Sequence, residues 1–269
     1  MIQTPNNKVH ISRNQILARQ REYSINQLKK TIDEGGVGVI ANGPNNSDMC
    51  DLLGHVGFDA AFIDFEHGGV SWAELADITR ACELWGMASV VRVNRLDEAQ
   101  ILRTLDQGAS AVMIPHVITV EDAQNAAQAC KYPPNGNRGV AGGRRAYGVD
   151  NYFQKADEQV HCIALIEDFE AIDNLPALTK VDGIDVFYVA PSDMAASMGH
   201  TGNPNHPEVQ EAIERAIKLV IDGGSVAGTL TNDSNLDKFL AMGVRCVGVP
   251  WQLWLQSSAE KFIERTRSC

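Results

Sequence analysis

The chain has 269 residues, of which 44% are hydrophobic and 21% are charged, and its formal net charge is −11. These values are typical of a globular protein with one large domain or two smaller ones. The excess of negative charge disfavours nucleic acid and membrane surfaces as partners, because their phosphates would be repelled. No apolar run reaches the roughly 18 residues that a membrane span needs.

The N-terminal segment MIQTPNNKVHISRNQ is polar and lacks the apolar stretch of a signal peptide. The six cysteines are scattered, and none forms a C-x-x-C pair. We therefore expect a cytoplasmic protein with reduced, buried thiols rather than a disulfide or metal framework. Residues 1–30 are predicted to be an N-terminal extension with a helix of its own, followed by a single domain over residues 31–269.

Short apolar runs recur along the chain, and each is followed by a turn and a helical pattern. Their continuous rather than alternating hydrophobicity is typical of strands that are buried on both faces. Strands that alternate with helices in this way predict an α/β fold, a single-domain (β/α)8 TIM barrel, with a doubly wound open sheet as the alternative. The runs lie at residues 36–41, 59–64, 88–93, 110–115, 162–167, 185–190, 225–230 and 245–250.

Several helix signals lie between these runs. SWAE at residues 71–74 and DEAQ at residues 97–100 resemble capping boxes, which begin helices. The segment from Pro207 places its apolar residues on one helical face and stops at the glycine pair 223–224. Residues 132–160 form a connection that is too long for the pattern, and such loops usually serve function or assembly.

Polar residues follow the strands at one end of the predicted barrel. Because active sites of parallel barrels lie at the carboxyl ends of the strands, we expect these residues to converge on one rim. The rim would then combine carboxylates, one arginine and imidazoles. Its members are Asn42, Asp64, Glu66, His67, Arg92, His116, Glu167 and Asp193.

Glu167 and Asp193 follow neighbouring strands and could share one hard cation through their carboxylate oxygens. Two protein carboxylates leave most of an octahedral shell to water and a chelating substrate, which suits Mg²⁺ or Mn²⁺. From the residues alone, a strand-end acid and a helix N-cap explain the same pair equally well.

His67 and Arg92 also have two explanations each. His67 is either an ordinary loop residue or a base whose imidazole is held in one tautomer by Asp64 or Glu66. Arg92 lies in an otherwise apolar strand and needs an anionic partner. That partner is either a carboxylate in a buried salt bridge or the oxyanion of a substrate.

Six stretches are distinctive when taken together: FIDFEHG, VVRVN, KYPPNGNRGV, LIEDFEAIDNLP, APSDMAASMGHTGNPNHPEVQEAIE and VGVPWQLW. In this order and spacing they resemble the HpcH/HpaI aldolase family, from about residue 28 to residue 265. The resemblance implies a divalent-metal-dependent class II pyruvate aldolase on a (β/α)8 barrel. Such an enzyme cleaves or forms 4-hydroxy-2-oxo acids from pyruvate and an aldehyde, by way of a pyruvate enolate.

The resemblance also implies roles for the rim residues. Glu167 and Asp193 would be the metal ligands, for Mg²⁺ or Mn²⁺ or, alternatively, Co²⁺. Arg92 would polarise the keto oxygen of pyruvate and stabilise the enolate. His67, with Asp64 beside it, would be the acid/base centre and would work through water.

Assembly and substrate anchoring are implied in the same way. The resemblance implies a homo-oligomer, a trimer or a hexamer, in which the C-terminal helix is exchanged and packs on a neighbouring barrel. Asp106 would reach the histidine of an adjacent subunit, and the backbone at Ser192 and Asp193 would hold the pyruvate carboxylate.

Three positions depart from the family pattern. Leu165 stands where family aldolases usually have Gln, Pro250 where many have Asp, and Ile40 where an aromatic residue is usual. Together with Trp251 and Trp254, these changes are expected to alter the aldehyde half of the site rather than its pyruvate half.

Other activities are compatible with the same barrel. One is decarboxylation of oxaloacetate, and another is cleavage of a CoA thioester, as in the citrate lyase branch. A CoA-binding site would need basic residues for the phosphates, and Arg144 and Arg145 are the only adjacent arginine pair. A barrel that binds a small acid without turnover is the non-enzymatic alternative.

Overall fold

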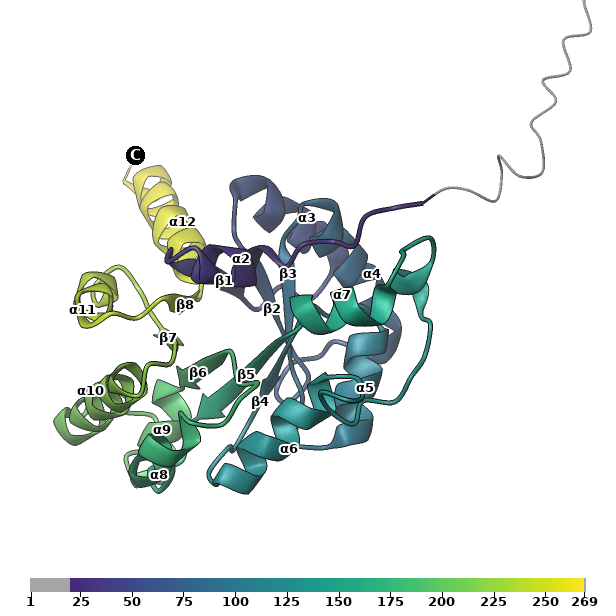
Figure 1. Ribbon diagram of the computed structural model, residues 1–269. Coiled ribbons are helices and arrows are strands. Elements are labelled where there is room, and N and C mark those ends of the chain that lie inside the picture. The colour runs from purple at the N-terminus through teal and green to yellow at the C-terminus, as the bar shows by residue number, and fades with distance from the viewer. Residues whose placement is uncertain (1–19, 269) are drawn as a thin grey trace, which may run out of the picture.

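The structure is a computed structural model that describes residues 20–268. Eight parallel strands close into one barrel, in which each strand pairs with its neighbours in the chain and β1 pairs with β8. Helices cover the outside of this barrel (Figure 1). The predicted (β/α)8 fold is therefore confirmed, and the open-sheet alternative is wrong.

Each strand lies within a few residues of a predicted run. Most strand residues are buried, because side chains fill the inside of the barrel while helices cover its outside. Within the described strands, Arg92 is the only Asp, Glu, Lys or Arg that is buried. The strands are β1 Gly38–Asn42, β2 Ala60–Asp64, β3 Ala88–Arg92, β4 Ala111–Ile114, β5 His161–Ile166, β6 Val186–Val189, β7 Ala227–Leu230 and β8 Cys246–Val249.

The helices follow local sequence signals. Ser71 and Glu74 form the predicted capping box of α4, and Asp97 caps α5 by accepting a hydrogen bond from the amide of Gln100. The helices are α2 Gln27–Asp33, α3 Ser47–Val56, α4 Trp72–Leu84, α5 Glu98–Asp106, α6 Val120–Cys130, α7 Tyr152–Gln159, α8 Ala171–Leu178, α9 Pro191–Ser197, α10 Pro207–Asp222, α11 Leu236–Met242 and α12 Gln252–Arg267.

Helix α10 confirms the helical periodicity read from the sequence. It begins at Pro207 and ends at Asp222, directly before the glycine pair. The apolar face packs against the barrel because the i, i+3 and i+4 positions share one side of a helix. Its buried residues are Val209, Ala212, Ile213, Ala216, Ile217 and Val220.

The amino-terminal end of the barrel is closed by α2. Leu28 and Ile32 are buried and belong to the apolar cluster that fills the barrel interior. A Cβ atom at Gly38 would lie 2.4 Å from Leu28 Cδ1, so the glycine allows the helix to approach β1 closely. The division between an extension and a barrel at residue 30 stays a prediction, and residues 1–19 of that extension lie outside the described residues.

The long connection at residues 132–160 is partly helical. It contains the 3₁₀ turn η1 (Arg144–Ala146) and the helix α7. Arg144 forms an ion pair with Glu83, and the buried guanidinium of Arg145 donates to the carbonyl oxygens of residues 108 and 109. Both arginines therefore hold this connection against the outer helices.

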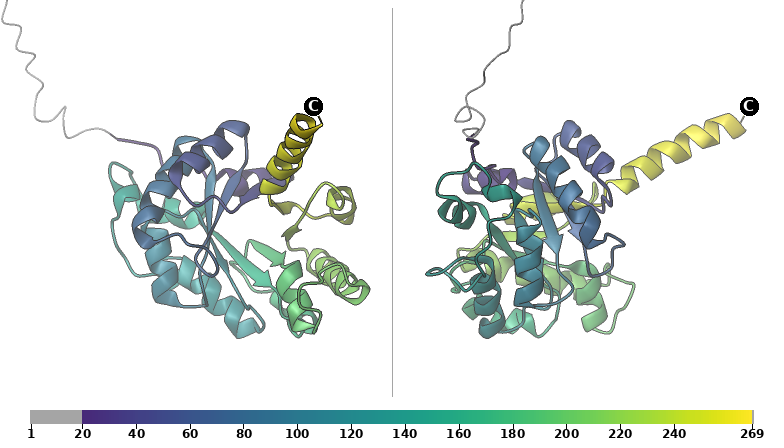
Figure 2. Two further views of the ribbon diagram at one scale, coloured as in Figure 1. Left: turned by 180° about the vertical axis from the view of Figure 1, so that it is seen from behind. Right: turned by 90° about the vertical axis from the view of Figure 1, so that its right-hand side faces the viewer.

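Helix α12 projects away from the barrel (Figure 2). None of its described residues is buried, and it exposes five large apolar side chains. Exchange of this helix between subunits would cover them, and it stays a prediction. The exposed apolar residues are Leu253, Trp254, Leu255, Phe262 and Ile263.

Two further expectations concern thiols and membranes. Among the described residues, Cys50, Cys82, Cys130, Cys162 and Cys246 are free and buried, as predicted. None of the described helices combines the length and hydropathy required to cross a bilayer.

Candidate active site

A cavity of about 300 Å³ opens at the carboxyl end of the barrel. Its deep part is formed by side chains that point inward from the strands. Because most of these side chains are hydrocarbon, the deep part of the cavity favours the apolar part of a ligand. The apolar lining residues include Ile40, Phe62, Met113, Leu165 and Leu230.

Tyr188 lies across the barrel beside two glycines. A Cβ atom at Gly248 would lie 2.1 Å from Tyr188 Oη, and one at Gly228 would lie 2.6 Å from Tyr188 Cδ2. The glycines of β7 and β8 thus make room for the ring. Asn42 ends β1 in the same region, and its Oδ1 is buried without a hydrogen-bond partner. The wall of the cavity therefore holds a buried amide oxygen with no hydrogen-bond partner among the described residues.

Arg92 is held at the polar end of the cavity by two carboxylates. Its Nε and Nη2 donate to Asp64 Oδ1 and Oδ2 at 2.9 and 2.7 Å, and its Nη1 lies 3.0 Å from Glu66 Oε2. Burial would raise the pKa of Asp64, but the hydrogen bonds and charge of Arg92 outweigh it and hold that pKa below its usual value. The guanidinium is therefore fixed in orientation before any substrate binds.

Glu167 follows β5 and is only 2% exposed. Its Oε1 accepts a hydrogen bond from the His116 amide at 2.9 Å and lies 3.4 Å from His116 Nδ1. Burial raises the pKa of Glu167 to about 7, and the nearby charges of Asp193 and Glu66 add to this effect. A cation bound beside this buried carboxylate would stabilise its negatively charged form.

His116 bridges the carboxylates on this rim. Its Nδ1 lies 2.9 Å from Asp168 Oδ2, and its Nε2 lies 4.0 Å from Glu66 Oε1. Burial lowers the pKa of His116, but the Asp168 hydrogen bond and the charges of Glu167 and Asp168 raise it overall. The residue has a φ of 53°, a left-handed conformation uncommon outside glycine. The sequence places His116 on the rim, but its role depends on contacts that only the structure shows.

The first turn of α9 brings Ser192 and Asp193 to the cavity wall. Pro191 begins the helix, where its missing N–H costs no hydrogen bond. Glu167 and Asp193 thus come from neighbouring strand ends, as predicted, and the charge of Asp193 acts on the buried Glu167.

His67 lines the mouth of the cavity and is exposed. Its amide donates to Asp64 Oδ1 at 3.3 Å, so Asp64 fixes the backbone of this turn. The carboxylates of Asp64 and Glu66 are engaged by Arg92, and in the described part of the chain neither has a hydrogen bond to the His67 imidazole. The imidazole is thus free to contact a substrate or water.

Asp106 does not line the cavity of its own chain. It ends α5, and its Oδ1 accepts a hydrogen bond from Arg138 Nη2 at 2.9 Å. Arg138 is 4% exposed, so this ion pair is largely shielded from water. A role for Asp106 in the site of an adjacent subunit stays a prediction.

The donor set fits a hard divalent cation. Glu167 and Asp193 supply carboxylate oxygens, which Mg²⁺ and Mn²⁺ prefer. The buried Glu167 carboxylate has a raised pKa, and among the described residues its one hydrogen-bond donor is the His116 amide. A cation between the two carboxylates would relieve both the burial of charge and the repulsion between them.

The departures from the family pattern occupy different places. Ile40 and Leu165 line the cavity, as expected. Pro250 and Trp254 instead border a groove beside α12, and Trp251 packs against the apolar cluster around α3 and α4. The expected effect of these three residues on the cavity is therefore not found in a single chain.

Comparisons with known proteins identify the family of the chain. The family described as HpcH/HpaI aldolase/citrate lyase matches residues 41–253. The 4-hydroxy-2-oxo-heptane-1,7-dioate aldolase of Escherichia coli (strain ATCC 8739) is 36% identical over 212 residues, which cover 77% of this chain and 81% of that protein. The hydroxypyruvate/pyruvate aldolase of Roseobacter denitrificans is 34% identical over 249 residues, 89% of this chain and 96% of that one.

A solved structure shows the same likeness in three dimensions. An HpcH/HpaI aldolase/citrate lyase family protein from Burkholderia cenocepacia J2315 superposes with a TM-score of 0.83 at 29% identity. The superposition covers 90% of this chain and 99% of that chain. On the strength of the matched family and these relatives, this chain belongs to the HpcH/HpaI aldolase/citrate lyase family.

Proposed function

We propose that this protein is a divalent-metal-dependent class II pyruvate aldolase. As a carbon–carbon lyase, it would cleave 4-hydroxy-2-oxo acids into pyruvate and an aldehyde, or join the two. The proposal depends on one observation above all: the buried carboxylate of Glu167 is close enough to Asp193 and Arg92 to feel the charge of one and act on the other, and Arg92 and Asp193 line the same cavity. The names of the two curated aldolases support the same reaction class.

The chemistry requires that negative charge be stabilised on the keto oxygen of pyruvate. Arg92 is suited to this task because Asp64 and Glu66 already fix its orientation. Preorganised donors of this kind stabilise a developing oxyanion without reorganising during the reaction. A divalent cation held by Glu167 and Asp193 would supply Lewis-acid polarisation of the same substrate.

His67 is the proposed acid/base group. Its exposed imidazole lies at the cavity mouth, where an aldehyde would enter. In the cleavage direction it accepts, through water, the proton of the 4-hydroxyl group while the carbon–carbon bond breaks. It then returns a proton to the methylene carbon of the enolate to give pyruvate. The amides at Ser192 and Asp193, in the first turn of α9, would hold the carboxylate.

The proposed oligomer explains two features of the isolated chain. Helix α12 exposes an apolar set of side chains, and Asp106 lies outside the cavity of its own chain. A homo-oligomer, a trimer or a hexamer, with exchanged α12 helices would bury the first and bring the second to an adjacent site. We propose a cytoplasmic location as well, which the buried free thiols support.

The alternative activities differ in what they demand of the cavity. A CoA thioester needs cationic groups for its phosphates, but Arg144 and Arg145 are engaged with Glu83 and with backbone carbonyls. Neither arginine lines the cavity. Decarboxylation of oxaloacetate yields the same enolate with the same residues, so it is the second candidate.

A coupled assay tests the proposal. Pyruvate released from a synthetic 4-hydroxy-2-oxo acid is measured with lactate dehydrogenase and NADH, with Mg²⁺ or Mn²⁺ and again after EDTA. We expect metal-dependent release of pyruvate, and parallel assays with oxaloacetate and a CoA thioester rank the alternatives. Release only from oxaloacetate would replace the aldolase by a decarboxylase.

A further inference from the structure

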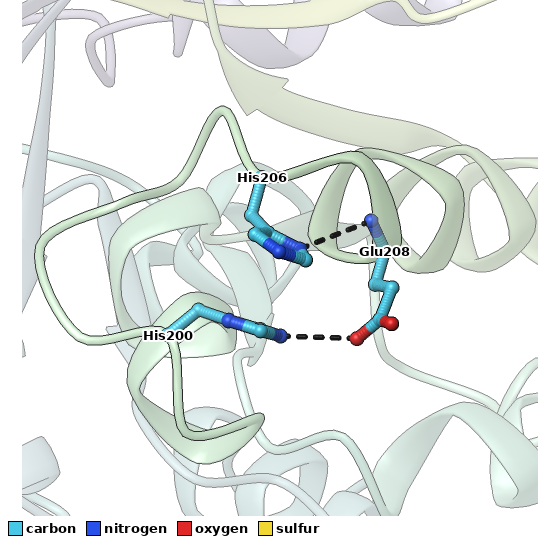
Figure 3. A group of neighbouring side chains, drawn as sticks. All are labelled: His200, His206 and Glu208. Atoms are coloured by element: carbon cyan, nitrogen blue, oxygen red, sulfur yellow. Dashed lines mark hydrogen bonds and ion pairs between the residues drawn. The ribbon is translucent and has the colours of Figure 1, made fainter.

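Two histidines and a glutamate gather on one loop outside the cavity. His200 follows α9, His206 is the N-cap residue of α10, and Glu208 lies in the first turn of α10. Figure 3 shows that the three side chains turn toward one another across this loop. None of them lines the cavity or contributes to the function proposed above.

The three side chains are close enough to share one ion. His200 Nε2 lies 3.1 Å from Glu208 Oε2, and the rings of His200 and His206 stack with centroids 3.7 Å apart and planes 15° apart. One ligand atom from each residue can be chosen so that all lie within 4.8 Å of one another. Ligand atoms around tetrahedral Zn²⁺ are roughly 3.3 Å apart, so these atoms would need to approach one another by at most about 1.5 Å.

The loop holds these residues in place before any ion binds. The His200 amide donates to Ala195 O at 2.7 Å, and the Asn203 amide donates to His200 O at 2.9 Å. The His206 amide in turn donates to Asn203 O at 3.1 Å. Because the backbone is fixed, binding an ion would cost mainly side-chain rotamer freedom.

The donor types indicate which ion would bind. Two imidazole nitrogens and one carboxylate oxygen form a typical ligand set of Zn²⁺ with a fourth position for water, whereas Mg²⁺ and Ca²⁺ prefer oxygen ligands throughout. His206 Nδ1 accepts a long bond of 3.3 Å from the Glu208 amide, which a turn of the ring would release. We propose that His200, His206 and Glu208 form a binding site for Zn²⁺ or a similar transition-metal ion.

A bound ion would join the end of α9 to the start of α10. Helix α9 carries Ser192 and Asp193 in its first turn, and His200 follows its last turn. The ion would therefore link the two helices and stabilise α9, which forms part of the cavity wall. It would do so because it binds only the folded state. It is separate from the cation proposed for Glu167, because the two ligand sets share no residue.

Zinc titration of the full-length protein tests this inference. Calorimetry with Zn²⁺ in the presence of excess Mg²⁺, which occupies carboxylate sites, is expected to show one equivalent per chain. Binding is also expected to raise the melting temperature by several degrees. With Co²⁺ in place of zinc, absorption bands of a four-coordinate ion are expected in the visible spectrum.

Matched variants decide whether these residues are the ligands. His200→Gln, His206→Asn and Glu208→Gln should each weaken zinc binding at least tenfold, and Asn is itself a good N-cap residue for α10. His55→Gln, at an exposed histidine on α3, should leave binding unchanged. Glu167→Gln should also still bind one equivalent of zinc per chain. The inference is overturned if the wild type takes up no equivalent, or if the loop variants bind zinc as the wild type does.

Discussion

Arg92 and Asp64 form a two-point ion pair, in which Nε and Nη2 of the guanidinium donate to both carboxylate oxygens at 2.9 and 2.7 Å. The residues end adjacent parallel strands and lie opposite each other in the register of β2 and β3. Of the two explanations for Arg92, a salt bridge or contact with a substrate oxyanion, the salt bridge is present. It also leaves the guanidinium oriented at the cavity, which the catalytic explanation requires.

The first prediction concerns the planar geometry of this arginine. Arg92→Lys keeps the positive charge but loses the fork that binds Asp64 at two points, so turnover should fall about 100-fold. Steady-state kinetics with a 4-hydroxy-2-oxo acid measure the effect. Arg95→Lys is the matched control, because that side chain is 72% exposed and should tolerate the change. Normal turnover of Arg92→Lys would remove this residue from the mechanism.

His116 should control the affinity of the proposed metal site. It contacts Glu167 through its amide and its ring, and partners of metal ligands typically contribute 10- to 100-fold to affinity. His116→Asn tolerates the left-handed backbone but shortens the side chain, so Mn²⁺ should bind about 10-fold more weakly. Calorimetry measures the dissociation constant, with Asn151→Gly as a control at the other left-handed non-glycine position among residues 20–268. Equal affinities would contradict the prediction.

Stability should depend on pH through His161, which begins β5 and is 1% exposed. Burial lowers the pKa of His161 to about 4, below its ordinary value of 6.5. The unfolded chain therefore takes up the proton first, and the free energy of unfolding should fall as the pH decreases from 6.5 toward 4. The loss attributable to this residue is about 3 kcal/mol.

Denaturant unfolding at several pH values checks this dependence. The variant His161→Gln should lose that part of the pH dependence which the histidine causes, whereas His55→Gln, at an exposed position, should keep it. An unchanged pH profile in the His161 variant would show that the imidazole is protonated equally in both states.

The lining of the cavity should select the aldehyde. Ile40, Leu165 and Leu230 are apolar, and among the described lining residues Arg92 is the only lysine or arginine and is already paired with Asp64. A carboxylate on the aldehyde would be desolvated without a partner there. In aldol addition to pyruvate, kcat/KM should be at least ~10-fold higher for butanal than for succinic semialdehyde.

Leu165→Gln provides the test of cause. The variant places a polar amide in the cavity, so it should lower the rate with butanal. The ratio of kcat/KM for butanal to that for succinic semialdehyde should therefore decrease. Preference of the wild type for the charged aldehyde would show that the acceptor binds outside the apolar lining, or against residues of an adjacent subunit.

The barrel and its rim could be predicted because their signals are local. Continuous apolar runs mark strands buried on both faces, and the residue after each run must lie at the carboxyl end. Glu167 and Asp193 could therefore be placed together although 26 positions separate them. Helix α10 was equally predictable, because its apolar periodicity and the residues that begin and end it all lie within one continuous segment.

Features that depend on tertiary packing were not visible in the sequence. Asp64 was expected beside the imidazole of His67, but pairing across β2 and β3 directs its carboxylate to Arg92. The raised pKa of Glu167 comes from burial. The role of His116 depends on its left-handed backbone conformation, which no sequence motif predicts. Pro250 could not be placed relative to the cavity, since that depends on the path of the chain into α12.

The most direct test of the central claim needs no knowledge of the aldehyde. The protein is incubated with pyruvate in D₂O, and exchange of the methyl protons is followed by NMR with Mg²⁺ or Mn²⁺, after EDTA, and with Glu167→Gln. Enolisation of pyruvate at this site predicts exchange that requires the metal and is lost in the variant. Absence of exchange with every divalent metal, or full exchange in Glu167→Gln, would contradict the account.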